Sequence, residues 1–397
     1  MYKWSLLCLL CLALAVWGLV YSCVGALAPF LMSDLQFTST QVGFLVSAVA
    51  IGYAIMMVPA GIWADLMGVK ILLSLGVLFL GVLIFTVTQY SSFVHEFILF
   101  GLIGFAGGLT MPTSSKAVMD WFDKEGRATA MGIKQSGINV GGMMAGILLP
   151  LLAVRFNWRF SLRLTALLCI ISAIVIFLLY KDHPSQKGQQ IGSRSVTAKD
   201  FMNLLADRRF LLLSATSFLM LLVQFGFTTY LVLFLTRQQN FDAIAAGKYL
   251  FASFGAGILG RIGFGLLSDF LFQDRRSAVL LFMAITMSMV CLFMGALPQY
   301  RLAHWVIFIL VLAFGLTGMG WNGMFLTIVV EFTRKELSGS AAGFSSTIGF
   351  IGVIIGTPLF GYILDKKESF FLAWNFLTIC ALSAVICILS LRKRERN

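Results

Sequence analysis

The sequence predicts an all-α membrane protein. Hydrophobic residues make up 59% of the 397 residues and charged residues only 12%, compared with about 25% charged residues in a typical soluble domain. The apolar residues form runs far longer than the ten or so alternating residues of a membrane β-strand. Because a backbone in lipid must satisfy its own hydrogen bonds, runs of this length are helices.

Twelve runs are long enough to cross a bilayer, since a spanning helix needs about 20 apolar residues. We expect these spans at residues 4–31, 41–64, 71–90, 96–119, 128–152, 160–180, 210–235, 245–268, 277–297, 303–330, 339–363 and 369–391. The connections are short except for residues 181–209, which contain proline, glycine, serine, glutamine and lysine. This pattern predicts an N-terminal six-helix bundle (1–180), a cytoplasmic linker (181–209) and a C-terminal six-helix bundle (210–397).

The cations between the runs predict the orientation of the chain. With the N-terminus inside, the cytoplasmic segments hold clearly more lysine and arginine than the outer loops, as expected for a membrane protein. Arg155 and Arg159 run against this trend. The net charge of +12 therefore reflects topology and does not indicate nucleic-acid binding. We expect a multi-pass protein of a bacterial inner membrane with both termini in the cytoplasm.

A short polar hinge at residues 61–70 separates two of the runs. Its only charges are Asp65 and Lys70, and its glycines allow a tight turn because glycine adopts backbone conformations closed to other residues. The hinge resembles the loop signature of the major facilitator superfamily, Gly-x-x-x-Asp-(Arg/Lys)-x-Gly-(Arg/Lys)-(Arg/Lys). The matching positions are Gly61, Asp65, Gly68 and Lys70, whereas Leu66 and Val69 stand where the family has cations.

The two halves of the sequence repeat each other. Gly265 and Asp269 follow Gly61 and Asp65 by 204 positions. A second set of echoes lies 211 positions apart: Asp120, Lys124, Glu125, Ala130, Gly132 and Gly141 recur as Glu331, Lys335, Glu336, Ala341, Gly343 and Gly352. These repeats predict two pseudo-symmetric bundles related by an axis along the membrane normal. The segment from Trp121 to Arg127 also resembles bacterial members of the superfamily, including organic-anion carriers.

The resemblance implies alternating access, in which two bundles rock around a central site and hinge charges form a cytoplasmic gate. Asp65 would cap the positive N-terminus of the eleventh span, and Asp269 would do so at the fifth. The gate residues that we expect are Asp65, Lys70, Asp120, Arg127, Arg261, Asp269, Glu331 and Arg334, with ion pairs between Asp120 and Arg127 and between Glu331 and Arg334, and with Arg261 serving the hinge at Asp269. The alternative is that these charges only anchor helix ends in water.

The resemblance also implies that spans 1, 4, 7 and 10 line the cavity. Helical periodicity places aromatic and polar residues on shared faces of these spans. The substrate-binding candidates are Trp17, Tyr21, Thr113, Lys116, Lys134, Gln224, Thr228, Trp321 and Asn322. The alternative is that the aromatic residues only pack and that the threonines bond to their own backbone.

Ionisable residues inside spans are costly and usually functional. Four cations inside the expected spans stand out: Lys116, Lys134, Lys248 and Arg261. Lys116 either binds a substrate carboxylate or pairs with Asp120 one turn away. Lys134 either serves the substrate or borders a stripe of small residues that lets helices approach closely. No Asp or Glu lies near the middle of any span, so the buried charges favour an organic anion, such as a carboxylate, as the substrate.

No motif for catalysis, a cofactor or a metal site is found in the sequence. The Gly-x-Gly-x-x-Gly pattern at residues 255–260 lies inside an apolar run, whereas dinucleotide binding requires a preceding strand. The seven cysteines also lie in apolar runs and are expected to fill space. No phosphate-binding loop is present, so ATP would not drive transport through this chain.

These observations predict a monomeric secondary transporter, and not an enzyme. It would move a small organic anion, with a coupling proton or a counter-anion as the second solute, as a symporter or an exchanger. Two alternatives stay open. One is an exporter of amphipathic drugs or a siderophore. The other is a non-transporting membrane receptor or sensor.

Overall fold

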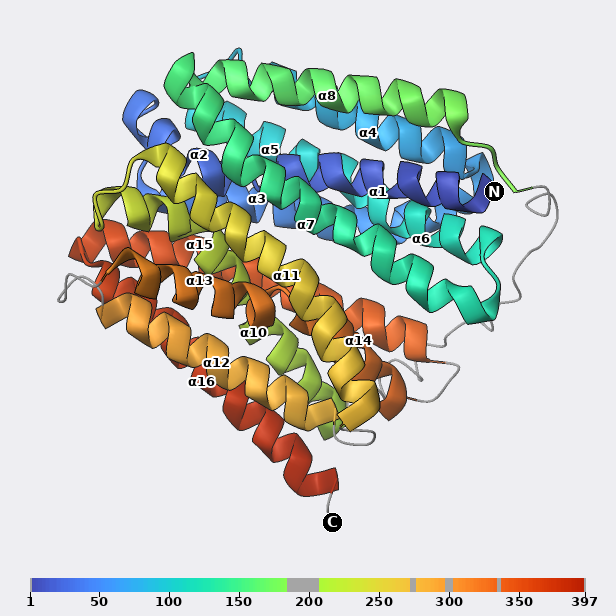
Figure 1. Cartoon of the computed structure of the whole chain (residues 1–397). Helices are drawn as coiled ribbons and strands as arrows, with labels where there is room; N and C mark the ends of the chain where they lie inside the picture. The colour runs from blue at the N-terminus through green and yellow to red at the C-terminus, as the bar shows by residue number, and fades with distance from the viewer. Residues whose placement is uncertain (1, 184–206, 272–275, 297–302, 334–336, 396–397) are drawn as a thin grey trace. The chain divides into compact units, whose positions relative to one another are not determined.

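The computed structural model describes residues 2–183, 207–271, 276–296, 303–333 and 337–395 (Figure 1). All regular structure in these ranges is α-helical, and no strand occurs among them. The described residues contain twelve helices, or pairs of consecutive helices, that are long and apolar enough to cross a membrane. The predicted fold class, an all-α membrane protein with twelve spans, is therefore confirmed.

The chain divides into two compact units, and each is described here by itself. The first unit comprises residues 1–190 and 229–251, and the second comprises residues 191–228 and 252–397. The helices wholly inside the first unit are α1 (Tyr2–Tyr21), α2 (Cys23–Asp34), α3 (Ser39–Met67), α4 (Val69–Val87), α5 (Phe93–Gly108), α6 (Thr110–Trp121), α7 (Lys124–Arg155) and α8 (Trp158–Leu179).

The second unit is also built of packed helices, and fewer of them lie wholly inside it. Its own helices are α12 (Arg276–Ala296), α13 (His304–Gly318), α14 (Trp321–Phe332), α15 (Ser338–Lys367) and α16 (Phe370–Glu395). Two long helices, α10 (Arg208–Arg237) and α11 (Ala243–Leu271), contribute residues to both units. Within the second unit α16 packs along α12 and α15.

Small residues allow helices of the first unit to pack closely in pairs. The pairs are α1 with α7, α3 with α5, and α4 with α8. A Cβ atom on Gly141 of α7 would lie 1.9 Å from the carbonyl oxygen of Ala15, and one on Gly52 of α3 would lie 1.9 Å from that of Gly101. The stripe of small residues next to Lys134 therefore serves close helix packing.

The glycine motif at residues 255–260 also serves packing. It lies inside α11, where a Cβ on Gly260 would come within 2.0 Å of the carbonyl oxygen of Leu316 in α13. There is no strand before this motif among the described residues, as a dinucleotide site would need.

Three of the spans are broken into two helices. The first span breaks at Ser22 between α1 and α2, the fourth at Leu109 between α5 and α6, and the tenth at Met319 and Gly320 between α13 and α14. Glycines precede or flank two of these breaks, at positions 107, 108, 318 and 320. Broken membrane helices expose backbone groups that are tolerated only inside protein or beside a cavity. Spans 1, 4 and 10 are among the four for which the sequence predicts cavity-lining residues.

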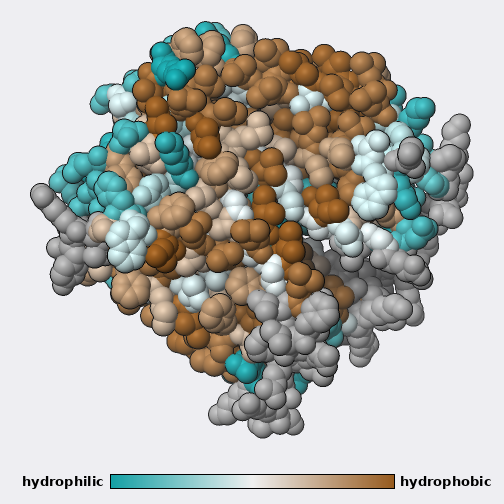
Figure 2. Space-filling model, viewed as in Figure 1, coloured by the Kyte–Doolittle hydropathy of each residue, from teal (hydrophilic) through white to brown (hydrophobic). Residues whose placement is uncertain are grey.

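The surface of the first unit over α8 is apolar, as contact with lipid requires. Figure 2 shows the surface over α8, at the top of the view, as brown, with teal atoms gathered toward the helix ends. Ile174, Phe177 and Leu178 of α8 are all more than half exposed. Such a surface suits hydrocarbon and would be unfavourable in water.

Candidate functional site

A buried lysine lies at the break in the fourth span. Lys134 of α7 is fully buried, and its ammonium group donates hydrogen bonds to the hydroxyls of Ser115 (2.6 Å) and Ser114 (3.0 Å) of α6. A longer contact reaches the carbonyl oxygen of Met111 (3.4 Å). No carboxylate of the described residues forms an ion pair with Lys134. The cation is therefore held by neutral oxygens alone.

The local sequence explains how α6 holds this cation. Ser114 and Ser115 are consecutive, and each hydroxyl donates to the carbonyl oxygen of Met111, at 3.0 and 2.9 Å. Both hydroxyl oxygens are then free to accept hydrogen bonds from the ammonium group. A buried charge without an opposite charge is expensive, so this arrangement suits a site that receives an anion.

Aromatic side chains gather in the same unit. Trp17 of α1 stacks on Tyr53 of α3, with ring centroids 5.4 Å apart and an interplanar angle of 6°, and lies 5.7 Å from the ring of Tyr21. The Trp17 ring also packs against Gly107, where a Cβ atom would lie 2.1 Å from it. Thr113 is fully buried, and its hydroxyl has no hydrogen-bond partner among the described residues. Apolar walls with a few polar groups are typical of small-molecule sites.

A neutral network lies at the break in the tenth span. The side-chain oxygen of Gln224 in α10 accepts hydrogen bonds from the indole nitrogen of Trp321 (2.9 Å) and from the Asn322 amide (3.3 Å). The Gln224 amide donates to the sulfur of Met319 (3.4 Å), inside the break. Trp321 is fully buried. The structure therefore brings three of the sequence-predicted residues into one cluster.

Two other predicted residues of the second unit have backbone partners. The hydroxyl of Thr228 donates to the carbonyl oxygens of Gln224 (3.1 Å) and Phe225 (3.3 Å), as the packing alternative predicts. The guanidinium group of Arg261 donates to the carbonyl oxygen of Met319 (3.1 Å). The fourth and tenth spans thus each have a carbonyl oxygen near the break that is bonded to a cation, Lys134 and Arg261 respectively.

Lys116 lies at the hinge. Its ammonium group forms an ion pair with Asp65 and donates to the carbonyl oxygen of Ala64 (3.1 Å). The sequence left open a substrate carboxylate or Asp120 as its partner, and the structure shows a third one. Sequence spacing favours partners on the same helix, whereas Asp65 comes from α3. The ion pair joins the ends of the second and fourth spans.

Asp182, which the sequence analysis did not consider, caps the other side of the hinge. Its carboxylate accepts a hydrogen bond from the backbone nitrogen of Lys70 (2.9 Å), at the start of α4. A negative charge is favourable at the N-terminus of a helix. Gly68 has φ of 82° here, which explains the glycine at this position. The Lys70 ammonium group lies over the Phe177 ring at 4.8 Å.

The remaining gate predictions have mixed outcomes. The guanidinium group of Arg127 donates to the carbonyl oxygens of Met119 (3.0 Å) and Phe122 (3.2 Å). The arginine thereby satisfies carbonyls at the end of α6, and its ion pair with Asp120 stays a prediction. Glu331 pairs with Arg276 of α12. Arg334 lies outside the described residues, as does the side chain of Asp269.

One prediction about buried charge needs correction. Glu96, in the first turn of α5, is only 2% exposed. The buried charged residues of the described chain are Glu96 and Lys134, so the sequence-based expectation that the buried charges are all cations is wrong. Glu96 is the first residue of its expected span, where an acid is usually hydrated.

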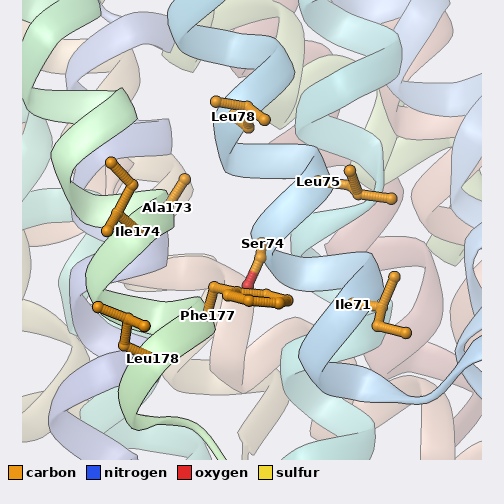
Figure 3. Close-up of a pocket in the computed structure, with 8 residues that line it drawn as sticks. All are labelled: Ile71, Ser74, Leu75, Leu78, Ala173, Ile174, Phe177 and Leu178. Atoms are coloured by element: carbon orange, nitrogen blue, oxygen red, sulfur yellow. The ribbon is translucent and has the colours of Figure 1, made fainter.

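An apolar groove between α4 and α8 is a poor candidate for an anion site. It has a volume of about 320 Å³ and is lined by Ile71, Ser74, Leu75, Leu78, Ala173, Ile174, Phe177 and Leu178. Figure 3 shows Phe177 reaching from α8 toward α4, with its ring beside the Ser74 hydroxyl. One hydroxyl among apolar side chains gives no counter-charge for a carboxylate. The groove suits hydrocarbon.

Sequence reasoning missed Tyr53, Ser114 and Ser115. Tyr53 belongs to the second span, which the resemblance does not assign to the cavity. The two serines were missed because a hydroxyl gives no signal in a sequence until the cation that it binds is placed beside it. Their position directly before Lys116 was the available clue.

Comparisons with known proteins agree with this architecture. The family model described as Major Facilitator Superfamily matches residues 10–357. The chain is similar to the hexuronate transporter of Bacillus subtilis (strain 168), with 25% identity over 92% of this chain and 89% of that protein. It is also similar to the probable galactarate/D-glucarate transporter GarP of Escherichia coli (strain K12), with 21% identity over 90% of this chain and 87% of that protein.

Solved structures share the fold. A nucleoside transporter, NupG, aligns with a TM-score of 0.82 at 16% identity, covering 98% of this chain and 100% of that chain. A bacterial homologue of the human lysosomal transporter Spinster, inward-facing and unoccupied, aligns with a TM-score of 0.76 at 17% identity, covering 98% and 95% of the two chains.

Proposed function

This chain belongs to the Major Facilitator Superfamily, a family of transporters, and we propose that it moves a small organic anion across the membrane by alternating access. The substrate carries a carboxylate. Transport is secondary, with a proton or a counter-anion as the second solute. The chain works as a monomer and catalyses no chemical reaction.

The observation that carries this proposal is the buried ammonium group of Lys134. It is fully buried, and its hydrogen-bond partners in the described part of the chain are neutral oxygens. A carboxylate that enters the site supplies the missing opposite charge, and charge-assisted hydrogen bonds are roughly twice as strong as neutral ones. Thr113, Trp17 and Tyr21 supply further contacts in the first unit. The candidate substrate contacts of the second unit are Gln224, Thr228, Trp321 and Asn322.

The similar proteins support the substrate class. Hexuronate, galactarate and D-glucarate are sugar acids, and these are the solutes in the names of two similar transporters. A third similar protein, from Chlamydia trachomatis serovar D, is a probable hexose phosphate transport protein, with 22% identity over 91% of this chain and 84% of that protein. All of these solutes are anions with several hydroxyl groups.

The hinge forms the gate in this proposal. Asp65 and Lys116 hold the cytoplasmic ends of two spans together in one state. The other gate residues are Lys70, Asp120, Arg127, Arg261, Asp269, Glu331 and Arg334. The protein lies in the inner membrane, with both termini and the segment at residues 181–209 in the cytoplasm.

A counterflow assay tests the proposal. The purified protein is reconstituted into proteoliposomes loaded with one member of a panel of sugar acids, dicarboxylates, sugar phosphates and neutral sugars. We expect labelled carboxylate to accumulate only when the vesicles contain a carboxylate. Accumulation of amphipathic cations instead would favour the drug exporter, and the absence of exchange across the panel would favour a receptor.

A further inference from the structure

Glu96 is a buried acid that no hydrogen bond satisfies. It lies in the first turn of α5, is 2% exposed, and neither carboxyl oxygen has a hydrogen-bond partner among the described residues. The substrate site that we propose does not use it. Acidic residues in the first turn of a helix are usually hydrated and interact with the helix dipole. Burial of this one requires another explanation.

A cation lies near Glu96 but is bound elsewhere. The positive charge of Arg159, in the first turn of α8, acts on the Glu96 carboxyl group, yet no ion pair joins them. The Arg159 guanidinium group donates to the hydroxyl of Ser91 (2.8 Å) and lies 4.4 Å from the centre of the Trp158 ring. The charge of Glu96 acts in turn on a second titratable group, the thiol of Cys23 in α2.

The most stable arrangement of Glu96 and Arg159 depends on whether Glu96 carries a proton. A neutral carboxyl group is buried at modest cost, whereas burying an ionised one without a partner is far more unfavourable. When Glu96 carries a proton, Arg159 is free to bond to Ser91 and stack on Trp158, as in this structure. When the proton leaves, Arg159 is the described cation that is placed to neutralise the carboxylate.

We propose that Glu96 is a proton-binding site, and that its proton decides whether Arg159 contacts Ser91 and Trp158 or pairs with Glu96. The switch lies at the end of α5 and α8 that we expect to face the outside of the cell. It would connect the external pH to the packing of the fourth and sixth spans. The switch does not depend on the identity of the substrate.

The indole of Trp158 reports the position of Arg159. It is 1% exposed, so its emission responds to the guanidinium group above the ring and little to solvent. The signal of Trp158 is obtained by subtracting the emission of Trp158→Phe from that of the unmodified protein in detergent without substrate. We expect this difference signal to change in one step as pH rises, and to lose its pH dependence in Glu96→Gln.

His95 provides the matched control. It is the neighbour of Glu96 in sequence and stacks on Tyr90, with ring centroids 4.9 Å apart. Because free histidine titrates near neutral pH, it is the main competing source of a pH response. The step should remain in His95→Gln. A step that survives in Glu96→Gln, or that disappears in His95→Gln, would overturn the proposal, and so would the absence of any step in the unmodified protein.

A second measurement does not require that the variant folds. A hydrophobic carbodiimide attaches to carboxyl groups that are protonated and buried. Mass spectrometry of the unmodified protein should show labelling of the peptide containing Glu96 at low pH and at least about a tenfold decrease after the Trp158 step. Equal labelling on both sides of the step would contradict the proposal. Neither measurement depends on transport, so both still test the Glu96 proposal if the counterflow assay shows no exchange.

Discussion

The breaks in the fourth and tenth spans solve the same problem with different chemistry. At the break in the fourth span, an ammonium group is bound by two hydroxyls and a carbonyl oxygen. At the break in the tenth span, the neutral Gln224 amide bonds to an indole, another amide and a thioether sulfur. The nearby Arg261 is bonded to a carbonyl oxygen of this break. Among the described residues no carboxylate pairs with the cation at the fourth span, whereas Gln224 at the tenth span bonds to three neutral groups. The cation of the fourth span is therefore better suited to a substrate anion than the amide network of the tenth.

The largest expected effect comes from removing the ammonium group. Lys134→Met should decrease carboxylate exchange by about 30-fold or more, equivalent to about 2 kcal/mol, because a buried charge contact is lost. The melting temperature should stay the same or rise, since Ser114 and Ser115 keep their bonds to Met111 and a buried charge is removed.

The matched control for this change is Lys248→Met. Lys248 belongs to a span but is exposed, so its removal should leave exchange nearly unchanged. Counterflow and thermal unfolding of both variants test the comparison. A fall in the melting temperature of Lys134→Met that accounts for the lost exchange would make Lys134 a structural residue only.

An intermediate effect is expected at the break in the tenth span. Gln224→Leu leaves the buried indole nitrogen of Trp321 and the Asn322 amide without their acceptor, so it should destabilise the fold by about 1–3 kcal/mol. Thr228→Val should cost less than about 1 kcal/mol, because the hydroxyl bonds only to carbonyls of its own helix. Denaturation of both variants in detergent measures these values. Equal losses of stability in the two variants would show that the hydrogen bonds at Gln224 do not stabilise the fold more than the single hydroxyl of Thr228.

The smallest effect is expected at the hinge. The side chain of Asp65 is 63% exposed and that of Lys116 is 21% exposed, so their ion pair contributes at most about 1 kcal/mol. Asp65→Asn and Lys116→Ala should each decrease exchange by only a few-fold, and the double variant should be no worse than either. The effect of Asp65→Asn should be smaller than in relatives with cations at the positions of Leu66 and Val69. Complete loss of exchange in either single variant would contradict this.

Features that depend on composition and local pattern were predicted correctly from the sequence. The twelve spans follow from long apolar runs, and their bounds differ from the observed helices by a few residues. The packing role of the glycines at 255–260 was also predicted. The family membership rested on the hinge at residues 61–70 and on the repeats. Each of these properties is encoded in residues close together in the chain or at a fixed spacing.

Features that depend on contacts between helices were not predictable in the same way. The sequence offered Asp120 as a partner for Lys116 because both lie on one helix, but the partner is Asp65 of another span. It offered Asp120 as a partner for Arg127, whereas the contacts seen for Arg127 are with carbonyl oxygens at the end of α6. The breaks in spans 4 and 10 also left no simple pattern, because glycine is common throughout membrane helices.

The most direct test of the central claim is whether Lys134 confers selectivity for charge. Counterflow of a sugar acid is compared with that of the corresponding neutral amide, in the unmodified protein and in Lys134→Met. We predict that the unmodified protein exchanges the acid at least about tenfold better, as expected for about 1.4 kcal/mol of discrimination, and that this preference disappears in the variant. A preference for the acid that is unchanged in Lys134→Met would contradict the account.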